Sequence, residues 1–439
     1  MRVALVTVYS HDRCTMKDVA GGFGTVFEIG RSLPARVLER AKSRLARLPS
    51  PSLGYLAAQL GAAGHEVCVA DVRRGEAGDD PIPRCDAALV LTSLVDAPAE
   101  QSVLAELSAA GVHTVAFGAY ATARPEVYAR VARVVVKGEA EALGARLADR
   151  TLAGVIDAGY VADLDDLPFP DWSPFPVARY RYALLTHRGP TLPVSGARGC
   201  AYGCGYCPFR VTAPFRERRP ERIVEEVRAM IAEHGVRAVA FRDPLFNFDE
   251  GRVRALARGL RGLDVRFSAE MRADRLDEPL LRELADAGLR SVELGVESVD
   301  RAMLAREHRK PPTAEQIEHV VEAAHRLGVR VIANFLLGLP DDDEASIRAT
   351  VAWAKRLNPF AVQFTVATPY PGTTLEARVR DRLTTVRPDR YTGWEPVFSH
   401  PRLGAERLAA LREWAYVSYH ARPRYVARFA RHAARSLLD

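Results

Sequence analysis

The feature that most restricts the fold of this chain is a repeated alternation of short apolar runs with helical stretches. Residues 3–8 form a continuous apolar, β-branched run, the pattern of a strand buried on both faces. The following strands are expected at residues 65–72, 86–92, 112–117 and 133–136, with helices at 53–63, 97–110 and 126–132. Such alternation predicts a doubly wound parallel sheet that binds ligands at the carboxyl ends of its strands.

The second half of the chain repeats the same unit. Strands are expected at residues 193–197, 238–242, 265–269, 291–294, 330–337 and 361–366, and helices at 220–234, 249–260, 278–287, 313–327 and 342–357. Six strand–helix steps suit a partial (β/α)₆ barrel, in which chemistry gathers at the carboxyl ends of the strands. The predicted fold class is therefore α/β: a Rossmann-like sheet, a partial barrel and a small, mostly helical C-terminal region. The expected division is 1–155 for the sheet, 156–190 for a proline- and aromatic-rich linker, 191–385 for the barrel and 386–439 for the helical region.

Composition sets only broad limits. The 439 residues are 48% hydrophobic and 26% charged, so sizeable cores are expected. A net charge of +6 is too mild to indicate nucleic-acid binding. No apolar run approaches the roughly 18 residues of a transmembrane helix, and the N-terminus reads as a strand rather than a signal peptide. Together with unpaired, clustered cysteines, this predicts a cytoplasmic protein.

Three of the six cysteines lie in one short segment, Gly199–Phe209. Cys200, Cys204 and Cys207 have the spacing C-x₃-C-x₂-C, which lets three thiolates reach one compact metal centre. A zinc ribbon would need a second C-x-x-C pair, and the sequence has none. Three thiolates on a four-iron cluster leave one iron open, as a reactive metal site requires. A local zinc or disulfide site is the alternative.

This cysteine segment resembles the signature of the radical S-adenosylmethionine (SAM) enzymes. The resemblance implies that Cys200, Cys204 and Cys207 bind a [4Fe-4S] cluster whose open iron holds the amino and carboxylate groups of SAM. An electron from the cluster then cleaves SAM to a 5′-deoxyadenosyl radical. It also implies that Tyr206 packs near the adenine or the cluster.

Two strand ends of the predicted barrel support this resemblance with charged residues. Asp243 follows the second strand and, by the resemblance, accepts from the SAM ammonium; the alternative is an N-terminal cap on the next helix. Arg272 and Glu270 end the third strand. Arg272 would clamp the SAM carboxylate and Glu270 would contact the ribose or the ammonium, unless the two form a structural salt bridge with each other.

Three further strand ends carry matching runs. Glu297 and Ser298 lie in a Gly-Val-Glu-Ser run that resembles the family's ribose-contacting segment, although Ser298 could instead cap a helix. Gly338 lets the backbone approach the adenine. Tyr370 lies in a Pro-Tyr-Pro-Gly-Thr run and faces the active cavity, or else belongs to a rigid turn.

The strand ends of the N-terminal sheet resemble the cobalamin-binding domain that precedes many radical SAM domains. The residues carried over as cobalamin contacts are Gly54, Thr92, Ser93, Gly118, Ala119, Tyr120, Gly138 and Glu139. The D-x-H-x-x-G motif that supplies a lower axial histidine is absent, because Val72, Arg73, Arg74 and Gly75 follow Asp71. The usual second glycine after the strand at 112–117 is Ala119. Many radical SAM members of this type also lack the histidine, so both departures are compatible with cobalamin.

The remaining reactive side chains have simpler interpretations. Cys68 and Cys85 are expected to be small buried apolar residues, and Cys14 lies in a loop with no activating neighbour in sequence. His308 is expected on the surface of a basic turn. The basic segment 31–48 is expected to form a solvated helix or lid. The C-terminal arginines recur at helical spacing and predict a solvated face, with weak contact to an anionic membrane surface or substrate as the alternative.

The resemblance as a whole implies a cobalamin-dependent radical SAM enzyme, most simply a methyltransferase. A deoxyadenosyl radical would activate an unactivated carbon of a small natural-product substrate, which then takes a methyl group from methylcobalamin. The alternatives are a rearrangement, cyclisation or oxidation without methyl transfer, a tRNA methylthiotransferase using Cys14, Cys68 and Cys85, and a non-enzymatic cobalamin sensor or carrier. An external electron donor of the flavodoxin or ferredoxin type is the expected partner, and nucleic acid is not. The sequence leaves the substrate and the oligomeric state open.

Overall fold

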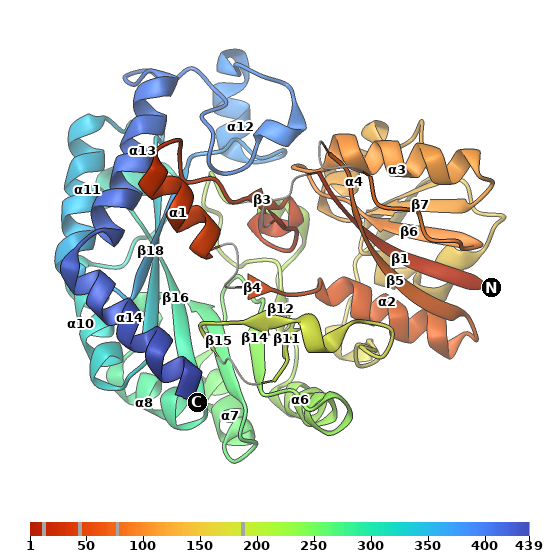
Figure 1. Cartoon of the computed structure of the whole chain (residues 1–439), viewed down its shortest axis with the longest axis horizontal. Coiled ribbons are helices and arrows are strands. Elements are labelled where there is room, and N and C mark those ends of the chain that lie inside the picture. The colour runs from red at the N-terminus through yellow and green to blue at the C-terminus, as the bar shows by residue number, and fades with distance from the viewer. Residues whose placement is uncertain (11–14, 43–45, 76–78, 186–188, 439) are drawn as a thin grey trace.

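The structure is a computed structural model that describes residues 1–10, 15–42, 46–75, 79–185 and 189–438. Two six-stranded sheets dominate it, and the chain passes from the first to the second through the segment that follows β9 (Figure 1). Cys14 lies outside the described residues. No helix formed by the described residues has the length and apolar character needed to cross a bilayer.

The first sheet is wholly parallel and has the strand order β5-β1-β6-β7-β8-β9. Its strands are β1 (Arg2–Tyr9), β5 (Glu66–Arg73), β6 (Ala87–Leu91), β7 (His113–Phe117), β8 (Val134–Gly138) and β9 (Gly154–Gly159). Helices α2 (Pro51–Ala62), α3 (Ala97–Ala109) and α4 (Ala119–Ala123) connect them. Strand β6 is buried along its whole length, as its uninterrupted apolar sequence predicts.

Two details of this sheet differ from the sequence prediction. The helix expected at 126–132 is wrong: α4 forms earlier, and residues 125–127 make only a 3₁₀ turn. Pro125 ends α4, because it disfavours helical backbone at Arg124 and has no N–H with which to continue that helix. The sixth strand, β9, was not predicted, because its short sequence has glycine at both ends and lies largely exposed at the sheet edge.

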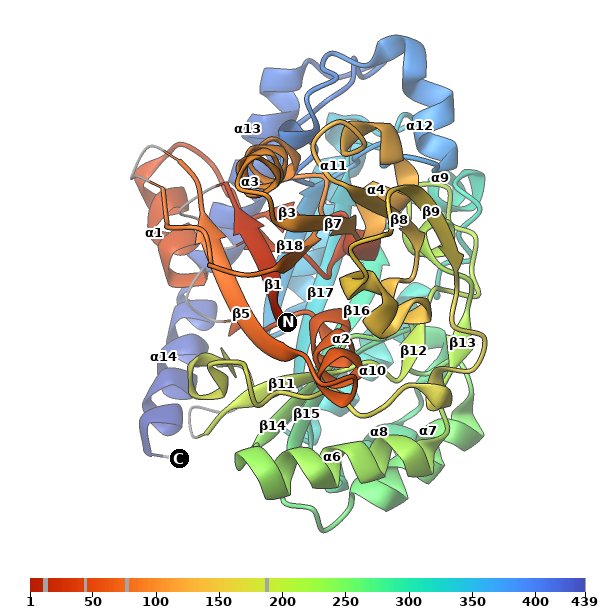
Figure 2. The same ribbon diagram turned by 90° about the vertical axis from the view of Figure 1, so that its right-hand side faces the viewer.

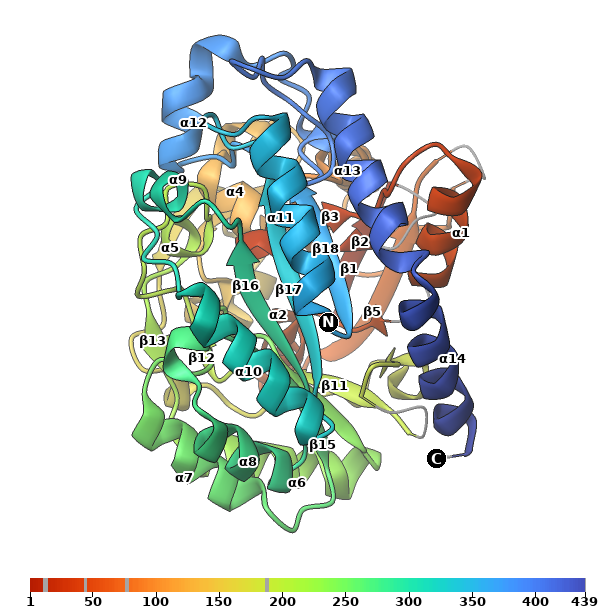
Figure 3. The ribbon, with the colours of Figure 1, turned by 90° about the vertical axis from the view of Figure 1, so that its left-hand side faces the viewer.

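The second sheet is also wholly parallel and follows chain order, as a partial barrel requires. Its strands are β11 (Thr191–Val194), β14 (Ala238–Phe241), β15 (Arg266–Met271), β16 (Leu289–Glu297), β17 (Arg330–Leu337) and β18 (Ala361–Val366). The outer layer consists of α6 (Pro220–His234), α7 (Glu250–Leu260), α8 (Glu278–Asp286), α10 (Ala314–Arg326) and α11 (Glu344–Leu357), several of which face the viewer in Figure 3. The shorter helices are α5 (Phe209–Thr212), α9 (Arg301–Arg306) and α12 (Thr374–Val379).

The edge strand β18 is covered by segments from both ends of the chain. Helix α13 (Ala405–His420) packs on β18, and α1 (Leu33–Lys42) packs on α13 (Figure 1). Glu413 on α13 accepts hydrogen bonds from the backbone N–H groups of Arg31 and Ser32 at 2.9 and 3.0 Å. The N-terminal segment thus leaves the first sheet, reaches the barrel and returns. Along this path β2 (Thr15–Met16) pairs with β3 (Thr25–Val26), and β4 (Ala46–Arg47) pairs with β10 (Arg181–Tyr182).

The C-terminal helix α14 (Pro423–Leu438) is only partly the solvated element that the sequence predicts. Arg424 and Arg431 are exposed. Arg428 instead donates hydrogen bonds to the backbone carbonyls of Asn358 and Phe360, at 2.9 and 3.2 Å. The interpretation of this arginine as a solvated residue is wrong, because its guanidinium satisfies carbonyl groups at the end of α11.

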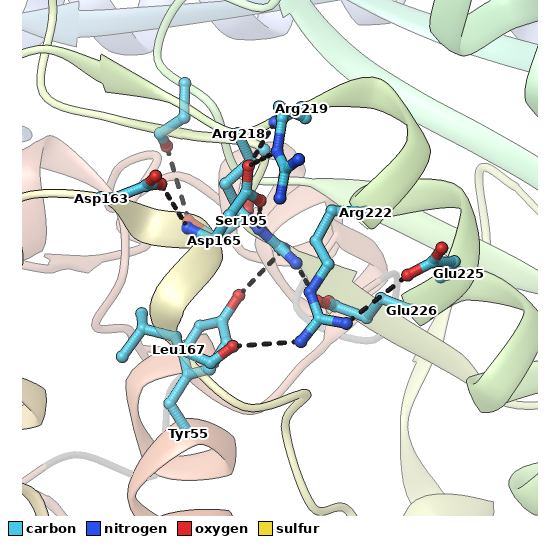
Figure 4. Close-up of polar contacts among 12 residues, drawn as sticks. Tyr55, Asp163, Asp165, Leu167, Ser195, Arg218, Arg219, Arg222, Glu225 and Glu226 are labelled. Atoms are coloured by element: carbon cyan, nitrogen blue, oxygen red, sulfur yellow. Dashed lines mark hydrogen bonds and ion pairs between the residues drawn. The ribbon is translucent and has the colours of Figure 1, made fainter.

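A buried arginine joins the first sheet, the linker and the barrel (Figure 4). The Arg218 guanidinium donates to the Tyr55 hydroxyl of α2 at 3.2 Å and to the Ser195 carbonyl at 3.1 Å. It also forms ion pairs with Asp165 of the linker at 3.4 Å and Glu226 of α6 at 2.7 Å. The side chains of Arg218 and Glu226 are each 1% exposed. This network fixes the first sheet beside the barrel mouth, as the side view in Figure 2 shows.

Candidate functional site

The three clustered cysteines lie in the loop between β12 (Ala197–Arg198) and α5, with thiols that are free and half-buried. Gly199 enters the loop at a φ of +69°, and a Cβ there would lie 2.4 Å from the Ala213 carbonyl oxygen. Burial raises the pKa of both the Cys200 and the Cys207 thiol. No three metal-binding side chains among the described residues converge on a single ion. A four-iron cluster has different needs, because each thiolate binds a separate iron, and the donor set of this loop fits such a cluster.

The residues that hold this loop in place were not predicted from the sequence. The Gly205 N–H donates to the Glu307 carbonyl at 2.7 Å, and the Glu307 carboxylate pairs with Arg378. Arg309 is buried, and although burial by itself lowers the pKa of its guanidinium, the neighbouring Tyr206, Glu297 and Cys204 raise it. Glu307 and Arg309 flank His308, which is exposed as expected. The sequence signal for Glu307 and Arg309 is the run of charged residues in this turn. The prediction for this turn concerned only the exposed His308.

Glu297 is brought next to the cysteine loop by an irregularity at the end of β16. The register of β16 shifts between Gly295 and Glu297, and Glu297 has a φ of +66°. Its carboxylate lies 3.4 Å from the Arg309 guanidinium. Glu297 and Cys204 therefore share one buried arginine, and a bound molecule at the cluster would meet this carboxylate.

Ser298 and Asp243 face away from that position. The Ser298 hydroxyl accepts from the Asp300 N–H at 3.1 Å and lies 3.3 Å from Thr350 in the outer helix layer. Asp243 is fully buried and accepts from the Gly196 N–H at 2.6 Å. The capping alternatives are wrong for both, because Asp300 and Asp249 cap the following helices α9 and α7.

Arg272 and Glu270 have separate surroundings, so the salt bridge considered between them is wrong. Arg272 forms a two-pronged pair with Asp274 at 2.9 and 2.7 Å, and its guanidinium lies over the ring of Tyr202 in the cysteine loop. Glu270 instead lies beside Glu293, its partner in the parallel register of β15 and β16. Arg272 is thus a fixed cation near the cluster loop, whereas Glu270 belongs to a group inside the barrel.

Gly338 follows the end of β17 with a φ of +76° and is covered by helix α13. A Cβ at this position would lie 2.6 Å from Leu408 of α13. The Gly338 N–H donates to Asp342 at 2.9 Å. Tyr206 of the cysteine loop packs with Leu336 and Leu339 of the same strand end. The glycine therefore allows the close approach of α13 behind the turn that Tyr206 contacts.

Replacement of Asp342 by asparagine is expected to change the pH dependence of stability. Burial raises the pKa of Asp342 from 3.8 to about 6. The native state therefore binds more protons than the unfolded state between these values, so this group stabilises the protein as pH falls from about 6 to about 4. An asparagine oxygen still accepts from Gly338 but carries no proton to exchange. Urea unfolding of both proteins from pH 4 to 7 measures this, and a constant difference between them would contradict it.

An aromatic stack lies between the end of β18 and the first sheet. The rings of Tyr370 and Phe23 are stacked with centroids 5.6 Å apart, and Phe23 meets Tyr120 edge-on at 6.4 Å. The turn carrying Phe23 is wedged between both parts of the molecule. A Cβ at Gly22 would lie 2.9 Å from that of Ala119, and one at Gly21 would lie 3.0 Å from Thr212 of α5. The carboxyl edge of the first sheet therefore meets the cysteine loop through this turn.

Several of the predicted cobalamin contacts come together at that edge. Thr92, after β6, donates to the Phe117 carbonyl at 2.9 Å and accepts from the Ala121 N–H at 3.2 Å. Gly138, at the end of β8, donates to Thr122 at 3.0 Å. Gly118 has a φ of +121°, which only glycine adopts readily. Thr92, Gly118, Ala119 and Gly138 are thus small, neutral residues at the turns of this edge, beside the larger Tyr120.

Ser93, at the same edge, belongs to a buried polar network. Lys17 forms ion pairs with Asp96 at 3.1 Å and Glu100 at 2.5 Å, and donates to Ser93 at 3.1 Å. Tyr128 donates to the other Glu100 oxygen at 2.5 Å. The network fixes the start of the segment that carries Phe23 against the sheet.

Gly54 and Glu139 lie in contacts between parts of the chain. A Cβ at Gly54 would lie 2.7 Å from Pro170 and 2.9 Å from Trp172, so this glycine allows the linker to pack on α2. The Glu139 carboxylate pairs with Arg198 at 3.2 Å and Arg216 at 2.6 Å, on the two strands of the antiparallel pair that β12 forms with β13 (Arg216–Glu217) beside the cysteine loop. Cys68 and Cys85 pack against the apolar core of the first sheet but are half-buried rather than fully buried as expected.

Comparison with known proteins places these features in a family. Residues 194–354 match the model of the radical SAM superfamily. An uncharacterized methyltransferase of Pyrococcus horikoshii is 27% identical over 341 residues, which cover 71% of this chain and 73% of that protein. The bacteriochlorophyllide d C-12(1)-methyltransferase of Chlorobaculum tepidum is 27% identical over 286 residues, covering 62% of this chain and 61% of that protein.

Solved structures share the arrangement of a parallel sheet followed by a partial barrel. The radical SAM methyltransferase TsrM from Kitasatospora setae, solved with cobalamin and a [4Fe-4S] cluster, superimposes with a TM-score of 0.64 at 16% identity, over 94% of this chain and 88% of that one. The cobalamin-dependent radical enzyme OxsB gives 0.56 at 14% identity, over 86% of this chain and 54% of that one. At these identities the likeness concerns the fold. With the cysteine motif and the barrel in place, residues 194–354 form a domain of the radical SAM superfamily.

Proposed function

We propose that this protein is a cobalamin-dependent radical SAM methyltransferase that acts on an unactivated carbon of a small molecule. The observation that carries the proposal is the contact between the cysteine loop and the carboxyl edge of the first sheet, through the turn at Gly21 and Gly22. Two cofactors, one held by each part, would meet across this contact. The names of the relatives support methyl transfer, since the Pyrococcus and Chlorobaculum proteins are both described as methyltransferases.

The cysteine loop and its neighbours would serve the iron–sulfur cluster and SAM. When bound, the cluster supplies the electron that cleaves SAM to a 5′-deoxyadenosyl radical. Cys200, Cys204 and Cys207 would ligate three irons. Arg272 carries a fixed positive charge for the SAM carboxylate, and Glu297 accepts hydrogen bonds from its ribose or ammonium. The backbone at Gly338 and the Tyr206 ring would flank the adenine. Because Ser298 and Asp243 are turned away, the proposal gives them structural roles.

The edge of the first sheet would serve cobalamin, which supplies the methyl group when bound. The small, neutral residues Thr92, Gly118, Ala119 and Gly138 would suit the side of a broad, flat ring. Phe23 and Tyr370 offer aromatic surface on the facing side. Glu139 would hold the β12–β13 pair in place, and Gly54 the linker. Their expected cofactor contacts are therefore not part of the proposal.

Other assignments follow from this chemistry. A cluster that cleaves SAM needs a one-electron reductant. We therefore propose an electron donor of the flavodoxin or ferredoxin type and a location in the reducing cytoplasm. The domain limits of 1–155, 156–190, 191–385 and 386–439 are kept as working limits. A rearrangement, cyclisation or oxidation without methyl transfer is the second candidate, because the same pair of cofactor sites would serve it.

Anaerobic reconstitution tests the proposal. The full chain is supplied with iron, sulfide, cobalamin, SAM and a reductant, and assayed for bound corrin, 5′-deoxyadenosine and S-adenosylhomocysteine. We expect about four irons per chain, a retained corrin spectrum and both SAM products. Failure to retain corrin would refute the cobalamin part and leave the radical part standing. About eight irons per chain would favour a methylthiotransferase, and corrin binding without SAM cleavage would favour a sensor or carrier.

A further inference from the structure

The lumen of the barrel contains a polar layer that the cofactor sites leave unused. Side chains alternate along each strand, and Phe267, Ala269 and Met271 of β15 belong to the core that packs against the outer helices. Glu270 therefore points into the lumen, as does Glu293, its register partner on β16. Neighbouring parallel strands lie roughly 4.8 Å apart, so the two carboxyl groups are adjacent. Toward the amino ends of the strands lies an apolar layer of Tyr182, Leu184, Leu185, Ala238, Ala240 and Ile332.

The charged residues around this pair leave it with excess negative charge. Arg242, the cation that follows β14, is held by Asp18 of the N-terminal segment at 2.6 Å. The Tyr182 hydroxyl donates to Glu293 at 3.0 Å. Burial and the neighbouring Glu293 raise the pKa of Glu270 to about 8, while Arg242 opposes the shift. Near pH 7 the carboxyl pair therefore shares one proton and carries one negative charge.

Two buried acceptors in the same wall lack partners. Ser291 precedes Glu293 by two residues on the same face of β16, is fully buried, and its hydroxyl has no hydrogen-bond partner among the described residues. Asn334 lies opposite Gly295 on β17, and its buried side-chain oxygen likewise has no described partner. Buried polar atoms are nearly always satisfied, so these groups mark a place where a polar ligand binds. Both accept hydrogen bonds, as do the two carboxyl groups.

We propose that the lumen group formed by Glu270 and Glu293, with the Asn334 side-chain oxygen two residues further toward the carboxyl ends of the strands, holds a protonated amino group of the substrate. An ammonium offers three N–H donors and one positive charge, which matches a wall of acceptors with one excess negative charge. A carboxylate head group would be repelled, because Arg242 is already paired. The inference rests on the proposed function in one respect, namely that the substrate enters the barrel.

Matched probes that differ only in their head group test this subsite on the reconstituted full chain. The probes are 2-phenylethylamine, 2-phenylethanol and 3-phenylpropionate, whose rings suit the apolar layer. Calorimetry at pH 7 in two buffers of different ionisation enthalpy measures affinity and proton exchange. We expect the amine to bind at least about tenfold more tightly than either analogue, since its hydrogen bonds are charge-assisted. We also expect it to release protons, because the cation displaces the shared proton.

Substitutions within the layer complete the test. Glu293→Gln and Glu270→Gln are expected to abolish the preference for the amine, while Glu250→Gln on the exposed start of α7 preserves it. Tyr182→Phe removes only the hydroxyl that orients Glu293 and should weaken the preference several-fold, which keeps the test valid if both glutamine variants misfold. Equal binding of the three probes by the natural protein, or a preference that survives both glutamine substitutions, would overturn the inference. Corrin retention and SAM cleavage are measured on the same samples, so failure of the proposed function is seen separately.

Discussion

Replacement of Cys207 by alanine is expected to abolish SAM cleavage and to lower the iron content of the reconstituted protein. Cys207 is one of the three half-buried motif thiols, and burial raises its pKa. Its loss leaves two thiolates, and a two-thiolate loop cannot hold a cluster with one open iron. Loss of residues that only support ligands costs roughly 10–100-fold, so loss of a ligand should exceed about 100-fold. The measurement is 5′-deoxyadenosine formation with a chemical reductant.

Cys68→Ala is the matched control for this prediction. Cys68 lies in β5 of the first sheet and packs against its apolar core, so its loss should leave iron content and SAM cleavage near those of the natural protein. If Cys207→Ala retained a full cluster and cleaved SAM at a comparable rate, the assignment of the cysteine loop would be wrong. If Cys68→Ala also lost iron, a second cluster in the first sheet would have to be considered.

Replacement of Arg218 by methionine is expected to lower the free energy of unfolding by about 3–5 kcal/mol. Methionine keeps much of the side-chain volume but leaves Glu226 as a buried charge without its partner at 2.7 Å. The Tyr55 hydroxyl and the Ser195 carbonyl also lose their donor. Urea unfolding at pH 7.5 measures the effect. The neighbouring Arg219 is the control, because its side chain is 74% exposed and Arg219→Met should cost at most about 1 kcal/mol.

The pH dependence of the Arg218 variant separates an unpaired charge from simple loss of packing. Burial raises the pKa of Glu226 and Arg218 opposes that shift, so its removal should raise the pKa further. The folded variant then takes up a proton, and its deficit should shrink as pH falls toward 5. The double variant with Glu226→Gln should recover part of the loss at pH 7.5. Equal deficits at both pH values, with no recovery in the double variant, would contradict the buried ion pair.

Local patterns in the sequence predicted most of the architecture. Strands such as β1 and β6 are continuous apolar runs, and α6 begins at Pro220 and ends at a left-handed Gly235, so their limits follow from short-range physics. The errors have the same origin. Pro125 shortened a helix that hydrophobic periodicity favoured, and the exposed edge strand β9 had too little apolar sequence to be recognised.

In the candidate site, some functional residues could be recognised from the sequence and others only from the structure. The cysteine motif could be recognised in the sequence, because its chemistry depends on spacing along the chain. Arg309 could not, because its importance comes from lying beside both Cys204 and Glu297. Glu297 and Ser298 are consecutive residues in one motif, yet the Glu297 carboxylate lies beside Arg309 near the cysteine loop and the Ser298 hydroxyl lies beside Thr350 of the outer helices.

The sequence by itself determined the two parallel α/β units, the cluster loop and the superfamily, since these depend on periodicity and on residues close together in the chain. Only the tertiary structure decided which charged groups meet. Asp18 and Arg242, which form an ion pair, are 224 residues apart, and the Arg31 backbone N–H and the Glu413 carboxylate that accepts from it are 382 residues apart. These contacts arise because the N-terminal segment crosses to the barrel and helix α13 covers its edge strand. Ion pairs between distant segments depend on packing that no local pattern specifies, so the acidic layer of the lumen became visible only in the folded protein.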